Sequence, residues 1–115
     1  MENLTTVSLD KTSTVLKLLG DKTRLKIMAL LHNRECCVCE LVEILHMSQP
    51  AISQHLRKLK DGKLIVEHRK GQWVFYEWNT NSEHFSLLES ILEYIPNVKH
   101  ELEELDNKGL RIICR

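Results

Sequence analysis

Three of the four cysteines fall within four residues, at Cys36, Cys37 and Cys39. The Cys-x-Cys spacing places two soft thiolates close together, and the adjacent third can complete a small three-sulfur site. Such a set suits As(III) or Sb(III), which bind three sulfurs in a pyramid, and also Cd(II) or Pb(II). A single helical cysteine is most often a buried small hydrophobe, but three in such a short segment cannot all face the core. The segment therefore predicts a site for a thiophilic ion.

A second chemistry is open to the same residues, because Cys36 and Cys39 also satisfy the Cys-x-x-Cys spacing of thiol redox enzymes. A thioredoxin-like site needs a preceding strand and a βαβ setting, whereas Ile27 to His32 reads as a helix. The sequence also lacks a phosphate-binding loop, a recognisable Cys-His-Asn arrangement and paired carboxylates in a predicted cleft. We therefore expect that the protein is not an enzyme. A thiol oxidoreductase is the least favoured alternative, and a thiol-based redox sensor stays open.

The length and composition predict one domain that spans residues 1–115. The chain is 43% hydrophobic and 28% charged, and 115 residues can bury a core without disulfides or a structural metal. The N-terminus has neither the basic start nor the apolar core of a signal peptide, and no apolar run approaches a membrane span. We expect a cytoplasmic protein with no membrane partner, in which the thiols stay reduced.

The charges are strongly segregated although the formal net charge is zero. Residues 46–72 carry a net charge of +4, whereas residues 83–106 carry −6. One surface is therefore basic, as a nucleic-acid interface requires, and another is acidic.

Helical periodicity and capping residues predict four helices in the first half of the chain. Asp21 and Ser48 are good N-caps for the second and the fourth helix. In the fourth helix, Ile52, Leu56 and Leu59 form a narrow apolar stripe, so the opposite face is polar and basic. The predicted helices run from about Leu9 to Gly20, from Asp21 to about Arg34, from about Val38 to His46, and from Ser48 to about Lys60.

The second half predicts a β-hairpin and a last helical region. The runs Leu64–Arg69 and Trp73–Trp78 flank a cationic tip, and the helical region starts near Glu83 and is interrupted by Pro96. The order α-α-α-α-β-β-α, mainly α with a β-hairpin, is that of a winged helix-turn-helix, in which the second helix of the motif enters the major groove. The alternative is a small helical domain whose basic face is merely solvated.

The candidate DNA-contacting residues lie on the fourth helix and in the hairpin. Serine, glutamine and arginine side chains can hydrogen-bond base edges and phosphates. On the helix these residues are Ser48, Gln49, Ala51, Ser53, Gln54, His55, Arg57 and Lys58, and in the hairpin they are Arg69, Lys70 and Gln72.

Three segments resemble the ArsR family of bacterial metal-responsive repressors. Residues 48–60 (SQPAISQHLRKLK) look like its recognition helix, residues 69–76 (RKGQWVFY) resemble its wing, and residues 21–27 (DKTRLKI) are similar to its second helix. The resemblance implies a homodimer, held together by residues of about 8–19 and 83–106, that binds operator DNA without a cofactor. It implies release by As(III) or Sb(III), with a Cd(II)- or Pb(II)-responsive repressor or a thiol redox-sensing repressor as alternatives.

The cysteine segment resembles the Cys-Val-Cys-acid-Leu metal box of arsenic- and cadmium-sensing members, which implies Cys37 and Cys39 as ligands. Many arsenic sensors carry a third cysteine three residues later, where this chain has Val42. Cys36 and Cys114 remain as candidates for the third thiolate. We expect Cys36, because it needs only a local backbone change, whereas ordering the terminal segment around Cys114 costs entropy.

The zinc, nickel and cobalt sensors of the family place paired Asp and His ligands on the last helix. This chain offers His84 there, with His100 and Glu104 further on, and no matching set of four ligands. We therefore expect no second metal site of that known type.

Overall fold

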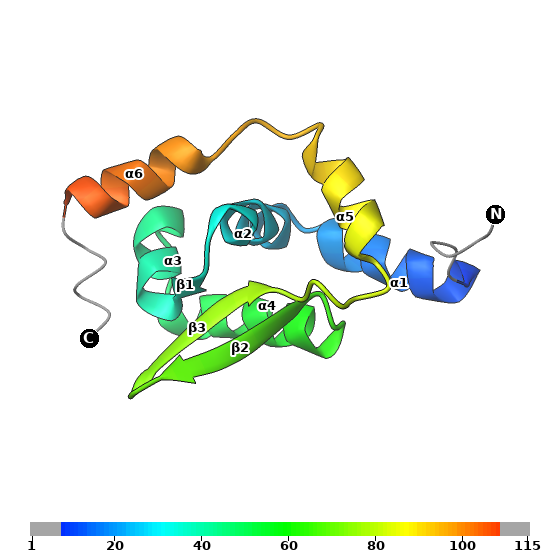
Figure 1. Cartoon of the computed structure of the whole chain (residues 1–115), viewed down its shortest axis with the longest axis horizontal. Helices are drawn as coiled ribbons and strands as arrows, with labels where there is room; N and C mark the ends of the chain where they lie inside the picture. Colours follow the sequence, from blue (N-terminus) through cyan, green and yellow to red (C-terminus); the bar gives the residue numbers. More distant parts are fainter. Residues whose placement is uncertain (1–7, 109–115) are drawn as a thin grey trace.

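The computed structural model describes residues 8–108, in which helices surround one side of a small sheet (Figure 1). The helix boundaries agree closely with those predicted from capping and periodicity. The elements in chain order are α1 (Leu9–Leu19), α2 (Lys22–Asn33), β1 (Cys36–Cys37), α3 (Val38–Leu45), α4 (Gln49–Asp61), β2 (Ile65–Lys70), β3 (Trp73–Trp78), α5 (Phe85–Leu92) and α6 (Lys99–Asn107).

Capping residues define the starts of α2 and α4. The Asp21 carboxylate accepts a hydrogen bond from the Arg24 backbone N–H at 3.1 Å, which holds the pKa of Asp21 below its usual value. The Ser48 hydroxyl accepts from the Ala51 N–H at 3.3 Å and begins α4. Between α3 and α4, His46 takes a left-handed conformation with φ of 55°, which ends α3 and turns the chain.

The three strands form an antiparallel sheet in the order β1-β3-β2. The hairpin is the predicted one, and Gly71 supplies the positive φ of 67° that its turn requires. Strand β1 is absent from the predicted order, because two cysteines do not show the alternation of a strand. Its partner residues are Cys36 with Tyr76 and Cys37 with Phe75. The order α-α-α-α-β-β-α therefore lacks β1 and counts α5 and α6 as a single region.

The core lies between α2, α3, α4 and the inner face of the sheet. The stripe of Ile52, Leu56 and Leu59 is buried, as predicted, and anchors α4 to the domain. The indole of Trp78 donates to the Met28 carbonyl at 2.8 Å and so joins the end of β3 to α2. The position of α4 relative to the sheet is therefore set by close packing.

The last helix, α6, packs against α2 and α3 of the same chain. Figure 1 shows α6 above α3, at the opposite end of the molecule from α1 and α5. Leu102 and Leu105 are buried there, and Lys26 pairs with Glu101 at 3.0 Å. Part of the segment 83–106, which the family resemblance assigns to the dimer interface, is therefore packed within one chain, and α5 remains the helix nearer to α1. Within residues 8–108, no helix has the length and apolar character needed to cross a bilayer.

Candidate nucleic-acid interface and thiol site

The outward face of α4 presents most of the predicted DNA-contacting residues to solvent. Because Ile52, Leu56 and Leu59 point inward, most of the residues between them point away from the domain. The exposed members of the predicted set on this helix and its N-cap are Ser48, Gln49, Ser53, Gln54, Arg57 and Lys58.

Two predicted residues of α4 lie differently. Ala51 and His55 are half-buried, and His55 Nδ1 lies 3.3 Å from the Arg24 guanidinium. Arg24 in turn donates to the Leu18 carbonyl at 2.7 Å. His55 therefore faces α2, and its contact there joins α4 to the end of α1.

The wing presents Arg69, Lys70 and Gln72 to solvent at its tip. Lys70 forms an ion pair with Glu35, the residue immediately before β1, and its ammonium lies 5.1 Å from the Phe75 ring centroid. The hydrogen bond from Lys70, with His68 close by, holds the pKa of Glu35 below its usual value. The wing is thus tied electrostatically to the cysteine segment, a link that the sequence analysis did not predict.

A groove between α4 and the wing carries charges of both signs. Arg57 and Lys60 line it, and Lys60 pairs with Glu67 of β2 at 3.0 Å. Tyr76 lies at its inner wall, and burial raises the pKa of this phenol, so its hydroxyl stays protonated at neutral pH. Asp61 and Glu67 also line the groove, so it combines two cations, two carboxylates and a neutral hydroxyl next to the exposed face of α4.

The cysteines of the predicted ion site differ in burial and direction. Cys36 is fully buried in the core, and its Sγ donates to the Arg34 carbonyl at 3.7 Å. Cys37 is 5% exposed, is disulfide-bonded and is the N-cap of α3, whereas Cys39 lies in the first turn of α3 with an exposed, free thiol. Since successive residues of a strand point to opposite faces, Cys36 and Cys37 lie on opposite sides of the sheet. The fourth cysteine, Cys114, lies outside the described residues.

Glu40 holds the start of α3 in place. Its carboxylate is buried and accepts a hydrogen bond from the Cys37 backbone N–H at 2.9 Å. The Arg34 guanidinium lies 3.7 Å from the Glu40 carboxylate. It also donates two hydrogen bonds, at 2.7 and 2.9 Å, to the Asp106 carboxylate of α6, and these bonds raise the pKa of Arg34. These contacts connect the cysteine segment to the last helix. The spacing Cys37-x-x-Glu40 matches a capping box and could have indicated the role of Glu40.

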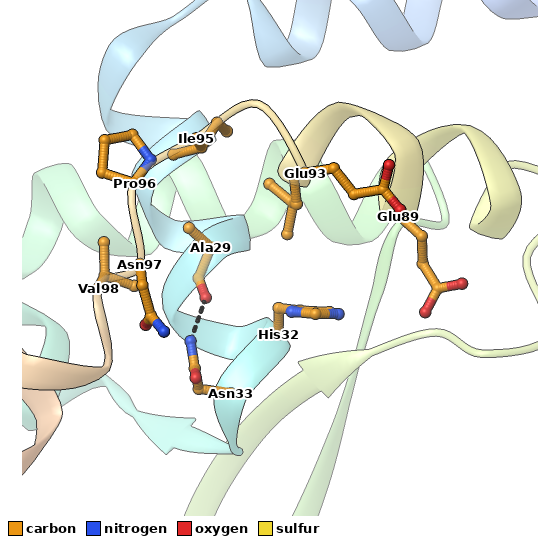
Figure 2. A pocket seen from close by; sticks show the side chains of 10 residues that line it. Ala29, His32, Asn33, Glu89, Glu93, Ile95, Pro96, Asn97 and Val98 are labelled. Atoms are coloured by element: carbon orange, nitrogen blue, oxygen red, sulfur yellow. Dashed lines mark hydrogen bonds between the residues drawn. The ribbon is translucent and has the colours of Figure 1, made fainter.

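A surface pocket lies away from the cysteines. Its volume is about 470 Å³, and it lies between α2 and the connection from α5 to α6 (Figure 2). Asn33 donates to the Ala29 carbonyl at 3.0 Å on its floor, and Glu89 and Glu93 lie at its edge. The described residues that line it include no cysteine. Its lining therefore does not suit a thiophilic ion.

The histidines considered for a zinc-type site do not come together with acidic partners in a set of four. His84 is 6% exposed and precedes α5, whereas His100 is exposed on α6, 3.4 Å from Glu104. This pair is an i, i+4 contact on the helix surface.

Comparisons of the sequence with known proteins agree with this geometry. A family model described as bacterial regulatory protein, arsR family, matches residues 21–65, which include α2, β1, α3 and α4. The chain is 30% identical over 109 residues to an arsenical resistance operon repressor of Staphylococcus aureus, covering 95% of this chain and 93% of that protein. It is 46% identical over 63 residues to the arsenic resistance transcriptional regulator ArsR1 of Pseudomonas putida, covering 54% of this chain and about half, 49%, of that protein.

Solved structures extend the likeness to the fold. Reduced HlyU from Vibrio cholerae shares 32% identity and a TM-score of 0.67, covering 76% of this chain and 92% of that one. The homodimeric winged helix-turn-helix domain of Mb0332 from Mycobacterium bovis shares 27% identity and a TM-score of 0.63, covering 76% of this chain and 84% of that one. The fold is a winged helix-turn-helix. Because the likeness to the Staphylococcus aureus repressor extends over nearly the whole of both proteins, this chain belongs to the arsR family of bacterial regulatory proteins.

Proposed function

We propose that this transcriptional regulator is a homodimeric repressor that occupies operator DNA and is released when its cysteines bind As(III) or Sb(III). The observation that carries the proposal is the position of the cysteines, which act as thiolates in the reduced protein. Cys37 caps α3, Cys39 lies in its first turn, and α3 is joined to the DNA-facing helix α4 through only His46, Met47 and Ser48. Such a regulator acts in the cytoplasm and is not an enzyme.

The exposed face of α4 supports the assignment of operator contacts. Gln54 and Arg57 are exposed on the side opposite the buried stripe, so they can reach base edges in the major groove. Arg69 and Lys70 on the wing are suited to phosphate contacts. We therefore retain the predicted contact residues of α4 and the wing, with His55 as a residue that positions α4 through Arg24.

Family membership and the names of the relatives support an arsenic-type inducer. Proteins named arsenical resistance operon repressors are found among the curated relatives from Staphylococcus aureus and Escherichia coli. We propose Cys36, Cys37 and Cys39 as the thiolates that bind the ion. Trivalent arsenic and antimony are thiophilic, and three sulfurs of one short segment match their preference.

The burial of the cysteines suggests how binding disturbs the DNA-binding form. Cys36 points into the core from β1 and Cys37 points to the other face, so the two sulfurs can approach one ion only if β1 leaves β3. A regular helix does not bring these sulfurs within reach of one ion, so the first turn of α3 would unwind together with the opening of strand β1. Since β3 belongs to the wing, opening β1 removes one of the contacts that orient the wing relative to α4.

Exposed apolar side chains support a dimer through α1 and α5. Leu9 is 84% exposed and Leu16 50% exposed on α1, and Tyr94 just after α5 is 88% exposed. Lys11 of α1 pairs with Glu83 just before α5 at 3.3 Å, which brings the two helices to one end of the molecule. A second copy of the chain would cover these apolar groups, and a symmetric dimer suits a palindromic operator.

A Leu16→Glu variant should elute as a monomer in size-exclusion chromatography.

A mobility-shift titration of the reduced protein on the DNA upstream of its own gene tests the proposal. As(III), Sb(III), Cd(II) and Pb(II) are added separately, and a Cys37→Ser, Cys39→Ser double variant serves as the control. We expect As(III) or Sb(III) to release the parent protein from DNA and to leave the control bound. Release by Cd(II) or Pb(II) alone would contradict the inducer, and release by oxidant alone, reversed by a reductant, would support a redox-sensing repressor.

A further inference from the structure

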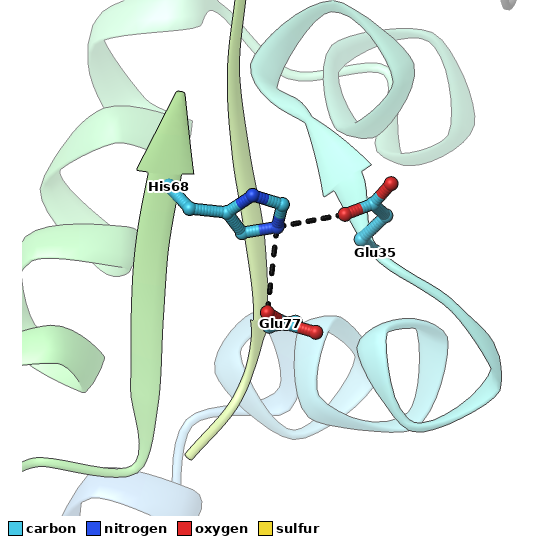
Figure 3. A group of neighbouring side chains, drawn as sticks. All are labelled: Glu35, His68 and Glu77. Carbon is cyan, nitrogen blue, oxygen red and sulfur yellow. Dashed lines mark ion pairs between the residues drawn. The ribbon is translucent and has the colours of Figure 1, made fainter. Parts of the chain in front are cut away.

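Three metal-binding side chains meet on the outer face of the sheet, the face on which the strand register also places Cys37. They are Glu35 before β1, His68 of β2 and Glu77 of β3, and one donor atom of each lies within 4.8 Å of the other two (Figure 3). His68 Nε2 lies 2.7 Å from Glu35 Oε1 and 3.4 Å from Glu77 Oε2. Each residue comes from a different segment of the chain, so only the folded sheet brings them together.

The strand register explains why they converge. His68 is paired with Phe75 and Val66 with Glu77, so His68 and Glu77 are diagonal neighbours on one face. Continuing the pairing of Cys36 with Tyr76 by one residue places Glu35 beside Glu77 on the same face. Two carboxylates side by side on neighbouring strands repel each other. A positive charge between them would remove this repulsion.

The imidazole nitrogen is directed at both carboxylates. His68 Nε2 is buried and has a carboxylate oxygen on each side of it, with Glu35 Oε1 the nearer. Lys70 occupies the other oxygen of Glu35, Oε2, and therefore leaves Oε1 available. The side chains of Glu35 and His68 are 21% and 32% exposed, so an ion can enter while water still reaches the site.

We propose that Glu35, His68 and Glu77 form a binding site for a divalent cation of the zinc type, separate from the thiol site. Zinc takes one imidazole nitrogen and carboxylate oxygens readily, and sites with three protein ligands complete the coordination with water. Magnesium is disfavoured, because it prefers oxygen ligands and gives up its own water reluctantly. A bound ion would join Glu35, the residue immediately before Cys36, to both strands of the wing, β2 and β3.

The test measures Zn(II) binding in a variant in which every cysteine except Cys36 is replaced by serine. A Cys37→Ser, Cys39→Ser, Cys114→Ser variant keeps Cys36 to fill the core, and isothermal titration with Zn(II) follows binding, with Mg(II) in a parallel titration. We expect one Zn(II) per chain, at least tenfold weaker binding after His68→Gln, and no comparable binding of Mg(II). Glu67→Gln is the matched control, since Glu67 is the preceding residue of β2 and pairs with Lys60 on the other face.

A second measurement does not depend on the cysteine variant. In the parent chain, His68→Gln should lower the number of bound Zn(II) by one per chain and leave release from DNA by As(III) unchanged. Failure of the thiol site would abolish As(III) release without changing this difference, so the two proposals can be told apart. Equal Zn(II) stoichiometry and affinity in the parent and in His68→Gln would overturn the proposal, as would equal binding of Mg(II).

Discussion

Replacing Cys36 by alanine tests whether ion capture opens the sheet. The structure buries Cys36 on the core face of β1, so its sulfur can join Cys37 and Cys39 only if β1 separates from β3. Separation breaks about two backbone hydrogen bonds at about 1 kcal/mol each and exposes one small side chain at about 1 kcal/mol. The total of about 3 kcal/mol corresponds to about 150-fold in an equilibrium constant.

This free energy keeps β1 paired without the ion, and ion capture through Cys36 must overcome it. In the Cys36→Ala variant the two remaining thiolates need no opening of β1, so the wing keeps its contact with the cysteine segment. We expect saturating As(III) to weaken operator binding about 100-fold in the parent, a coupling of about 2.7 kcal/mol, and less than about threefold in Cys36→Ala. Cys114→Ser should respond like the parent.

Fluorescence anisotropy with labelled operator DNA measures both affinities, with each reduced protein titrated with and without As(III). Urea denaturation provides the control for folding, because alanine in place of a buried cysteine should lower the free energy of unfolding by only about 1–2 kcal/mol. The reasoning is refuted if Cys36→Ala is released as readily as the parent. Loss of the response in Cys114→Ser, with Cys36→Ala unaffected, would assign the third thiolate to the C-terminal segment instead.

Three further predictions concern DNA contact and pH. Gln54→Ala and Arg57→Ala should each weaken operator binding by about 1–3 kcal/mol in a mobility-shift assay, with the elution volume of the protein unchanged; normal binding would show that the wrong face of α4 was assigned. Lys70→Ala should weaken specific and nonspecific DNA binding alike and make the salt dependence shallower by about one unit, whereas an unchanged slope would remove Lys70 from the phosphate contacts. Folding lowers the pKa of Glu35 from its ordinary value of 4.5, mainly through the hydrogen bond from Lys70 and also through His68. The ionised carboxylate therefore stabilises the fold above pH 4.5, and this stabilisation is lost as the pH falls through the lowered pKa of the folded state. Acid unfolding of Glu35→Gln should therefore depend less on pH below about 4.5 than that of the parent, and parallel curves would contradict the sign.

Local chemistry allowed the helices and the hairpin to be predicted from the sequence. Asp21 and Ser48 cap the helices where capping predicts, and Gly71 supplies the turn of the wing. The inward stripe of α4 was also predictable, because helical periodicity assigns the buried and exposed faces without knowledge of any neighbour. The exposed positions of Gln54 and Arg57 follow from the same periodicity.

Only the tertiary structure decided which residues of distant segments meet. Strand β1 exists because Cys36 and Cys37 pair with β3, and two residues carry no detectable strand pattern of their own. The same pairing buries Cys36, which the sequence treated as an available thiolate next to Cys37. His55 turned toward Arg24 because α2 lies beside α4, and periodicity along one helix does not reveal its neighbours.

The Glu35, His68 and Glu77 cluster shows the same division between sequence and structure. Its members are separated by up to 42 residues in sequence, and none belongs to a recognisable ligand motif. They share a site because the register of three strands places them on one face, and register is a property of pairing between strands. The sequence by itself therefore determined the elements other than β1, their caps and their exposed faces, since these depend on near neighbours along the chain. The burial of Cys36 and the convergence of these donors depended on contacts between segments that only the folded chain brings together.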